Sequence, residues 1–143
     1  MPDSNRFYTL KGYALQEGKA ITSSMEDYLE MIYRIHSSSE AVRIGALAES
    51  LNVKPSSASK MVSNLKKQGL VSFTKYGYIK LTAAGSKLGE YLVFRHDTIH
   101  RLLCHINRSD NELEQAEKIE HFINAETVEN ISRLLEELQR SKS

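Results

Sequence analysis

Two short helical patterns joined by a tight turn constrain the fold of this chain more than any other feature. Apolar residues recur at helical spacing over about 43–51 and 55–68, and the sequence 52–54 separates the two segments. Pro55 suits the first turn of the second helix, where a missing N–H costs nothing. Gly69 suits the position just after its end. The pattern predicts two helices connected by a turn too short to let them separate.

Two β-rich stretches follow these helices. Residues 70–74 and 78–81 flank a Lys-Tyr-Gly sequence, which is typical of a short hairpin. Two helices, a tight turn and a hairpin predict a winged helix-turn-helix, whose second helix enters the major groove of DNA. The alternative is a helix-turn-helix used for packing or protein contacts. The serine-rich exposed face disfavours it, because ordinary surface helices carry Glu, Ala and Lys pairs.

Charge is distributed unevenly along the chain. The net charge is +1, but residues 41–90 carry eight basic and two acidic groups, whereas residues 1–40 have a net charge of −2 and residues 91–143 of −3. A basic middle segment indicates contact with a polyanion, and a lysine-rich solvated face is the alternative.

The predicted second helix exposes small hydroxyl side chains and amines. Such groups suit base edges and phosphates, and each phosphate contact makes affinity more dependent on salt. A tyrosine at the hairpin tip would lie against a sugar or a minor-groove edge. The predicted DNA-contacting residues are Lys54, Ser56, Ser57, Ser59, Lys60, Asn64, Lys66, Lys67, Lys75 and Tyr76.

Helical periodicity continues on both sides of this module. A helix is predicted over about 25–36, with N-cap candidates in the hydroxyl cluster 22–24. Further helices are predicted near 83–106, 112–122 and 125–140.

Metal-ligand residue types recur at helical spacing in the acidic flanks. Asp27 and Glu30 are three residues apart and so share one helix face. The run 117–121 reads E-x-x-E-H, and His96 lies on the predicted long helix. Carboxylates and imidazoles from three helices resemble the ligand sets of helical dimetal sites. Solvated helix faces are the ordinary alternative, and a chelate of His96 with His100 is another.

Four stretches carry a more specific resemblance. They are SMEDYLE at 24–30, KPSSASKMVSNL at 54–65, KLGEYLVFRH at 87–96 and EKIEH at 117–121. Over about four-fifths of its length, the chain resembles the diphtheria-toxin-repressor family of metal-dependent regulators, and most of all its short manganese-responsive branch. The resemblance implies a binuclear metal site formed by Asp27, Glu30, His96, Glu117, Glu120 and His121.

Ligand chemistry indicates which metal such a site would prefer. Iron-responsive relatives have methionine and cysteine at the two positions occupied here by Asp27 and Glu117. Four carboxylates and two imidazoles form a hard, oxygen-rich set that suits Mn²⁺. Because intrinsic affinity follows the Irving–Williams order, Fe²⁺, Co²⁺, Zn²⁺ and Cd²⁺ are alternatives in vitro. Cys104 is not at the family's cysteine-ligand position and is expected to be a packing residue.

The predicted fold is mainly α-helical, with two domains after an N-terminal extension. The extension covers residues 1–22, and the winged helix-turn-helix with its short β-hairpin wing covers 23–83. A C-terminal helical domain for metal binding and dimerisation covers 84–143. The chain ends after the last predicted helix, without the SH3-like domain of longer family members, which agrees with the manganese branch.

The predicted function is a manganese-dependent transcriptional repressor that binds double-stranded operator DNA as a metal-activated homodimer and controls metal-uptake genes. Alternatives are an iron-responsive regulator of the same family and a winged-helix regulator with a non-metal signal. A dimetal enzyme is disfavoured, because no nucleophile or general base remains beside the six ligand positions; we expect no enzymatic activity and no small-molecule substrate. The expected dimer surface is apolar: Ile123, Val128, Ile131, Leu134, Leu135 and Leu138.

A cytoplasmic location is expected. No apolar run approaches the roughly 20 residues of a membrane helix, so no membrane contact is predicted. The N-terminus lacks the pattern of a secretory signal, and the single cysteine, Cys104, suits a reducing compartment.

Overall fold

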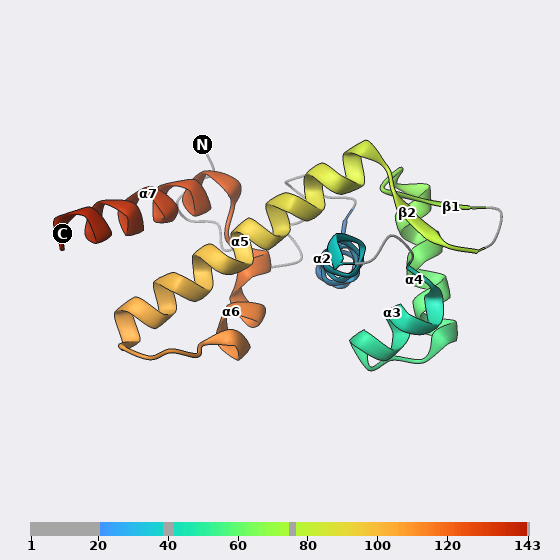
Figure 1. Cartoon of the computed structure of the whole chain (residues 1–143), viewed down its shortest axis with the longest axis horizontal. Helices are drawn as coiled ribbons and strands as arrows, with labels where there is room; N and C mark the ends of the chain where they lie inside the picture. Colours follow the sequence, from blue (N-terminus) through green and yellow to red (C-terminus); the bar gives the residue numbers. More distant parts are fainter. Residues whose placement is uncertain (1–20, 39–41, 75–76, 143) are drawn as a thin grey trace, which may run out of the picture.

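The computed structural model describes residues 21–38, 42–74 and 77–142, and this part of the chain is mainly helical. A two-stranded hairpin follows the helix-turn-helix, so the predicted fold class is confirmed (Figure 1). The elements in chain order are α2 (Ser23–Ser38), α3 (Ile44–Leu51), α4 (Pro55–Lys67), β1 (Val71–Phe73), β2 (Ile79–Leu81), α5 (Ala83–Asn107), α6 (Leu113–Ile119), the 3₁₀ turn η1 (Glu120–Phe122) and α7 (Ala125–Ser141).

Helix α2 begins where the hydroxyl cluster predicted an N-cap. The Thr22 side chain accepts a hydrogen bond from the backbone N–H of Met25 at 3.1 Å. Leu29 and Ile32 on this helix are fully buried, in the same core as Leu47 and Leu65 of the helix-turn-helix. Burial of a leucine or isoleucine stabilises a fold by about 1.5–3 kcal/mol. Packing therefore attaches α2 to the helix-turn-helix.

The turn and the wing have the local chemistry expected from the sequence. Pro55 occupies the first turn of α4, and Gly69 after α4 has a φ of +75°, a conformation that favours glycine. Strands β1 and β2 are antiparallel, with Val71 paired to Leu81. An additional bridge between Val42 and Ile79 ties the hairpin to the segment before α3.

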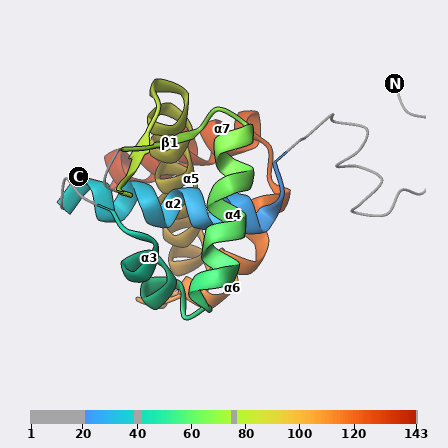
Figure 2. The same ribbon diagram turned by 90° about the vertical axis from the view of Figure 1, so that its right-hand side faces the viewer.

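Helix α5 extends from the wing to the C-terminal half of the molecule (Figure 1). Its N-cap, Thr82, accepts a hydrogen bond from Gly85 N–H at 3.0 Å, and the Thr82 backbone N–H donates to Leu70 O at 3.1 Å. Farther along, α2 runs across α5, as Figure 2 shows. Gly89 permits this crossing, because a Cβ there would lie 2.8 Å from the Tyr33 ring.

A second, smaller core fixes the C-terminal helices. Ile99 and Leu103 of α5 pack with Ala116 of α6 and Val128 of α7. Val128 is therefore fully buried within its own chain, so its expected role in a dimer surface is wrong. None of the helices in the described ranges is long and apolar enough to cross a membrane.

Candidate metal centre and nucleic-acid interface

Five of the six sequence-predicted ligands lie together where α2, α5 and η1 meet. They form two groups whose ligand-type atoms lie within 4.8 Å of one another. One contains Asp27, Glu120 and His121, and the other contains Glu30, His96 and Glu120. Glu120 belongs to both groups, so one carboxylate joins them.

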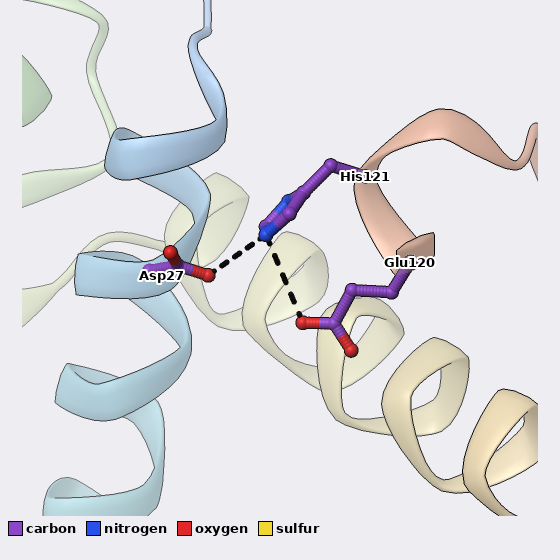
Figure 3. Close-up of side chains that lie close together, drawn as sticks. All are labelled: Asp27, Glu120 and His121. Atoms are coloured by element: carbon purple, nitrogen blue, oxygen red, sulfur yellow. Dashed lines mark ion pairs between the residues drawn. The ribbon is translucent and has the colours of Figure 1, made fainter. Parts of the chain in front are cut away.

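The first group is open to solvent on one side. His121 Nε2 lies 3.0 Å from Asp27 Oδ1 and 3.9 Å from Glu120 Oε1 (Figure 3). The Asp27 side chain is 53% exposed, whereas the Glu120 side chain is only 2% exposed. An ion could therefore approach from the Asp27 side.

The second group is more deeply buried. His96 Nδ1 lies 2.7 Å from Glu120 Oε2, and this hydrogen bond is the main cause of a raised pKa at His96. Burial, followed by the negative charge of Glu120, raises the pKa of Glu30. Because the charge of Glu120 opposes ionisation of Glu30, a positive charge between the two carboxylates would stabilise the charged form of Glu30.

The chemistry of these donors fits a divalent cation. The two groups supply three carboxylates and two imidazoles, with nitrogen and oxygen atoms and no sulfur. Such a set suits Mn²⁺ better than it suits metals that select thiolate ligands.

Glu117 is the one predicted ligand outside these groups. It is exposed on α6, and neither of the two groups found in the described part of the chain includes it. Its assignment as a ligand stays a prediction from the family resemblance.

Two residues to which the sequence analysis gave no site role adjoin the first group. Glu26 Oε1 lies 2.9 Å from His121 Nδ1, and both Nη atoms of Arg95 lie 3.3 Å from the Glu26 carboxylate. Burial opposes ionisation of Glu26, but His121 and Arg95 outweigh it and hold the pKa of that carboxyl below its usual value. Nothing in the sequence marks an arginine before His96 as buried.

His121 is the most strongly perturbed of these groups. Hydrogen bonds to Asp27 and to Glu26 raise the pKa of its imidazole to about 9. Below that pH the metal-free ring keeps a proton on Nε2, the nitrogen that faces Asp27 and Glu120. A metal that uses this nitrogen must displace the proton.

We therefore expect Mn²⁺ affinity to rise by at least about tenfold per pH unit from pH 6.5 toward pH 9, because a proton on His121 competes with the metal and the raised pKa of His96 adds to that competition. Titration calorimetry at pH 7 and pH 8 measures the change. His105→Gln removes an exposed imidazole outside both groups and should keep the same pH dependence. Equal wild-type affinities at the two pH values would contradict the expectation.

The predicted DNA-contacting face is exposed on α4 and just before it. The side chain of Asn64 is half-buried, and Lys75 and Tyr76 lie outside the described residues. The wing is fixed by Arg43, whose guanidinium donates to Tyr78 Oη at 2.7 Å and lies 4.3 Å from the ring centroid. The exposed members of the predicted set are Lys54, Ser56, Ser57, Ser59, Lys60, Lys66 and Lys67.

Comparison with known families defines the class of protein. Residues 20–79 match the iron dependent repressor N-terminal DNA binding domain, and residues 82–142 match the iron dependent repressor metal binding and dimerisation domain. Together these matches define a metal-dependent DNA-binding regulator. The chain belongs to the iron-dependent repressor family, as its resemblance to the diphtheria-toxin repressors predicted.

Individual relatives support the same assignment. The chain is 40% identical over 115 residues to the HTH-type transcriptional regulator MntR of Oceanobacillus iheyensis. The aligned region covers 80% of this chain and 78% of the relative. It is 36% identical over 123 residues to the HTH-type transcriptional regulator MntR of Shouchella clausii, and this aligned region covers 85% of this chain and 86% of the relative. These relatives are transcriptional regulators, in agreement with the prediction that the chain is not an enzyme.

A solved structure agrees in fold. The structure of a manganese-dependent transcriptional repressor in complex with manganese matches with a TM-score of 0.69 and 30% identity. The match covers 78% of this chain and 52% of that one, so the chain spans about half the length of this solved structure.

Proposed function

We propose that this protein is a manganese-dependent transcriptional repressor that binds operator DNA as a homodimer in the cytoplasm and controls metal-uptake genes. The observation that carries the proposal is the position of Glu120. This buried carboxylate adjoins Asp27 and Glu30 of α2, which packs in the DNA-binding module, and His96 of α5. Metal ligands would thus come from both halves of the molecule.

Manganese is the favoured metal because carboxylate oxygens dominate the donor set. MntR relatives and a repressor solved with manganese support this choice. Fe²⁺, Co²⁺, Zn²⁺ and Cd²⁺ should bind in vitro as well, and relatives named ScaR have been solved with Zn²⁺ and with Cd²⁺.

The proposed switch depends on repulsion between acidic groups. Without metal, Glu30 and Glu120 oppose each other across the contact between α2 and η1. Bound Mn²⁺ supplies the positive charge that offsets them. Asp27 and Glu30 then hold α2 against α5 and η1, and α4 moves with α2 because the two helices share one core. Metal binding would therefore fix the position of α4, the recognition helix that enters the major groove.

A homodimer would use this restriction to select its operator. Two recognition helices related by a two-fold axis must lie about 34 Å apart to read successive major grooves. Apolar side chains exposed on the C-terminal half suit the dimer contact: Ile106, Leu113, Phe122 and Leu134. A coupling free energy of about 1–3 kcal/mol would change operator affinity roughly 5- to 150-fold.

The test is binding of the full chain to a genomic fragment library with and without Mn²⁺. We expect Mn²⁺ to select a small set of fragments, which then serve as operators for quantitative titration. Selection of the same fragments without added metal, after treatment with a chelator, would refute the metal switch and leave the DNA-binding role intact.

Lysines on α4 provide a second test on the selected operator. Lys60→Ala should weaken binding. The plot of log K against log salt has a negative slope, and its magnitude should fall by about 0.9, the value for one lost phosphate contact. Lys118→Ala on α6, where the lysine pairs with Glu114 at 3.0 Å, is the matched control and should leave the slope unchanged. An unaltered slope in Lys60→Ala would remove Lys60 from the interface.

A further inference from the structure

We propose that Glu26 is a positioning residue for metal binding, which orients His121, and that Arg95 makes Glu26 necessary. The inference rests on the proposed metal site. At this site the Glu26 carboxylate accepts the Nδ1–H of His121. Nε2 is then the nitrogen that loses its proton to a metal, and its lone pair is directed at the space beside Asp27 and Glu120.

The two ring nitrogens of His121 face different partners. Nδ1 lies 2.9 Å from Glu26 Oε1, and Nε2 lies 3.0 Å from Asp27 Oδ1. Adjacent residues of α2 thus contact opposite sides of one imidazole that is almost entirely buried. A metal-binding histidine needs its proton on the nitrogen away from the metal, and a carboxylate at that nitrogen fixes this tautomer.

Arg95 provides the reason that Glu26 is needed. Its side chain is 3% exposed, and its Nη2 lies 3.3 Å from His121 Nδ1, close enough to donate a hydrogen bond to that nitrogen. An imidazole that accepts this hydrogen bond keeps its own proton on Nε2 and cannot bind a metal there. Glu26 prevents this, because it accepts from Nδ1 at a shorter distance and also engages both Nη atoms of Arg95.

A second observation shows how few constraints hold Arg95. Within the described residues, its Nε is buried and has no hydrogen-bond partner. Its Nη atoms contact Glu26 and His121. Loss of the Glu26 carboxylate would leave His121 Nδ1 as an acceptor close to a buried cation that needs one.

The experiment measures Mn²⁺ affinity from the electron paramagnetic resonance signal of the free aqueous ion. Glu26→Ala should lower affinity by about 10- to 100-fold, the range for groups that orient a metal ligand. Glu26→Gln keeps an oxygen that can accept the Nδ1–H of His121, so Mn²⁺ affinity should fall by less than in Glu26→Ala. Glu114→Gln removes an exposed carboxylate on α6 and is the matched control, with wild-type affinity expected.

A double variant separates orientation from a merely structural ion pair. Adding Arg95→Met to Glu26→Ala removes the competing donor, so affinity should recover in part. If Glu26 and Arg95 only formed an ion pair that holds α2 against α5, Mn²⁺ affinity should not recover in the double variant. Circular dichroism melting of each metal-free variant checks folding, and Glu26→Gln carries the test if Glu26→Ala does not fold.

A spectroscopic readout reports the tautomer directly. In the Zn²⁺-loaded protein, which is diamagnetic, the Nδ1–H of His121 should give a slowly exchanging low-field proton resonance that Glu26→Ala loses. Wild-type Mn²⁺ affinity in Glu26→Ala, or an unchanged resonance, would overturn the positioning role. Absence of Mn²⁺ binding by the wild type would instead overturn the proposed function.

Discussion

Replacing Glu120 by glutamine should abolish the effect of Mn²⁺ on DNA affinity. The side chain belongs to both groups of candidate ligands, so one substitution weakens two metal positions. We expect Mn²⁺ affinity to fall by at least about 100-fold, since loss of a mere orienting group costs about 10- to 100-fold. The roughly 5- to 150-fold gain in operator affinity expected of a coupled switch should vanish with it. Calorimetry with Mn²⁺ and operator titrations measure the two quantities.

The same variant separates metal binding from folding. Glutamine has nearly the shape of glutamate and can still bond His96, whose Nδ1 lies 2.7 Å from Glu120 Oε2. Burial is the main cause of the raised pKa of Glu30, and the neutral glutamine removes the repulsion by Glu120 that adds to it. This gain offsets the loss of the charge-assisted bond to His96, so the metal-free variant should melt close to the wild type. Glu114→Gln is again the control, and full Mn²⁺ activation in Glu120→Gln would contradict the shared-ligand arrangement.

Much of the fold could be predicted because its signals are local. Pro55 and Gly69 mark the limits of α4, and the hydroxyl of Thr22 caps α2 within three residues. The periodicity of apolar residues in a helix predicts that one face is buried, but it does not indicate whether that face packs within the chain or against a second copy. Val128 illustrates this limit, because its position on α7 suits a dimer surface equally well, yet it packs on Ile99 of its own chain.

The candidate site was predictable to the extent that ligand types share helix faces. Asp27 and Glu30 could be paired from their spacing, and His96 and Glu120 from the family resemblance. The contacts around Arg95 could not be predicted from the sequence, because the role of a buried arginine becomes clear only when Glu26 and His121 are seen beside it. Long-range pairing of charges depends on how α2 crosses α5, which no local pattern records.

That crossing depends on how α5 is joined to the wing. Thr82 bonds to the backbone carbonyls of Gly69 and Leu70, at 2.7 and 3.1 Å, so the first turn of α5 is part of the DNA-binding module. The same helix carries Arg95 and His96 to the metal centre. Any change that displaces its first turn should therefore disturb DNA binding and metal binding together.

Gly85→Ala is expected to have the largest effect on stability. A Cβ at this position would lie 1.9 Å from Leu70 O and 2.9 Å from Leu70 C, both backbone atoms that no side-chain rotation can move. Helix α5 must shift away from the hairpin, at a cost of about 3 kcal/mol, the upper part of the range for overpacked sites. This exceeds the roughly 1 kcal/mol that alanine contributes over glycine in a helix.

Thermal unfolding of the metal-free protein measures the effect. For a chain of this size, a net loss of about 2 kcal/mol should lower Tm by roughly 4–10 °C. Gly45→Ala on α3 is the matched control, because nothing lies within 4 Å of its added Cβ and helix propensity alone should raise Tm. If Gly85→Ala also raised Tm, α5 would not be rigidly joined to the wing. Metal bound near His96 would then have no direct route to the recognition helix except through α2.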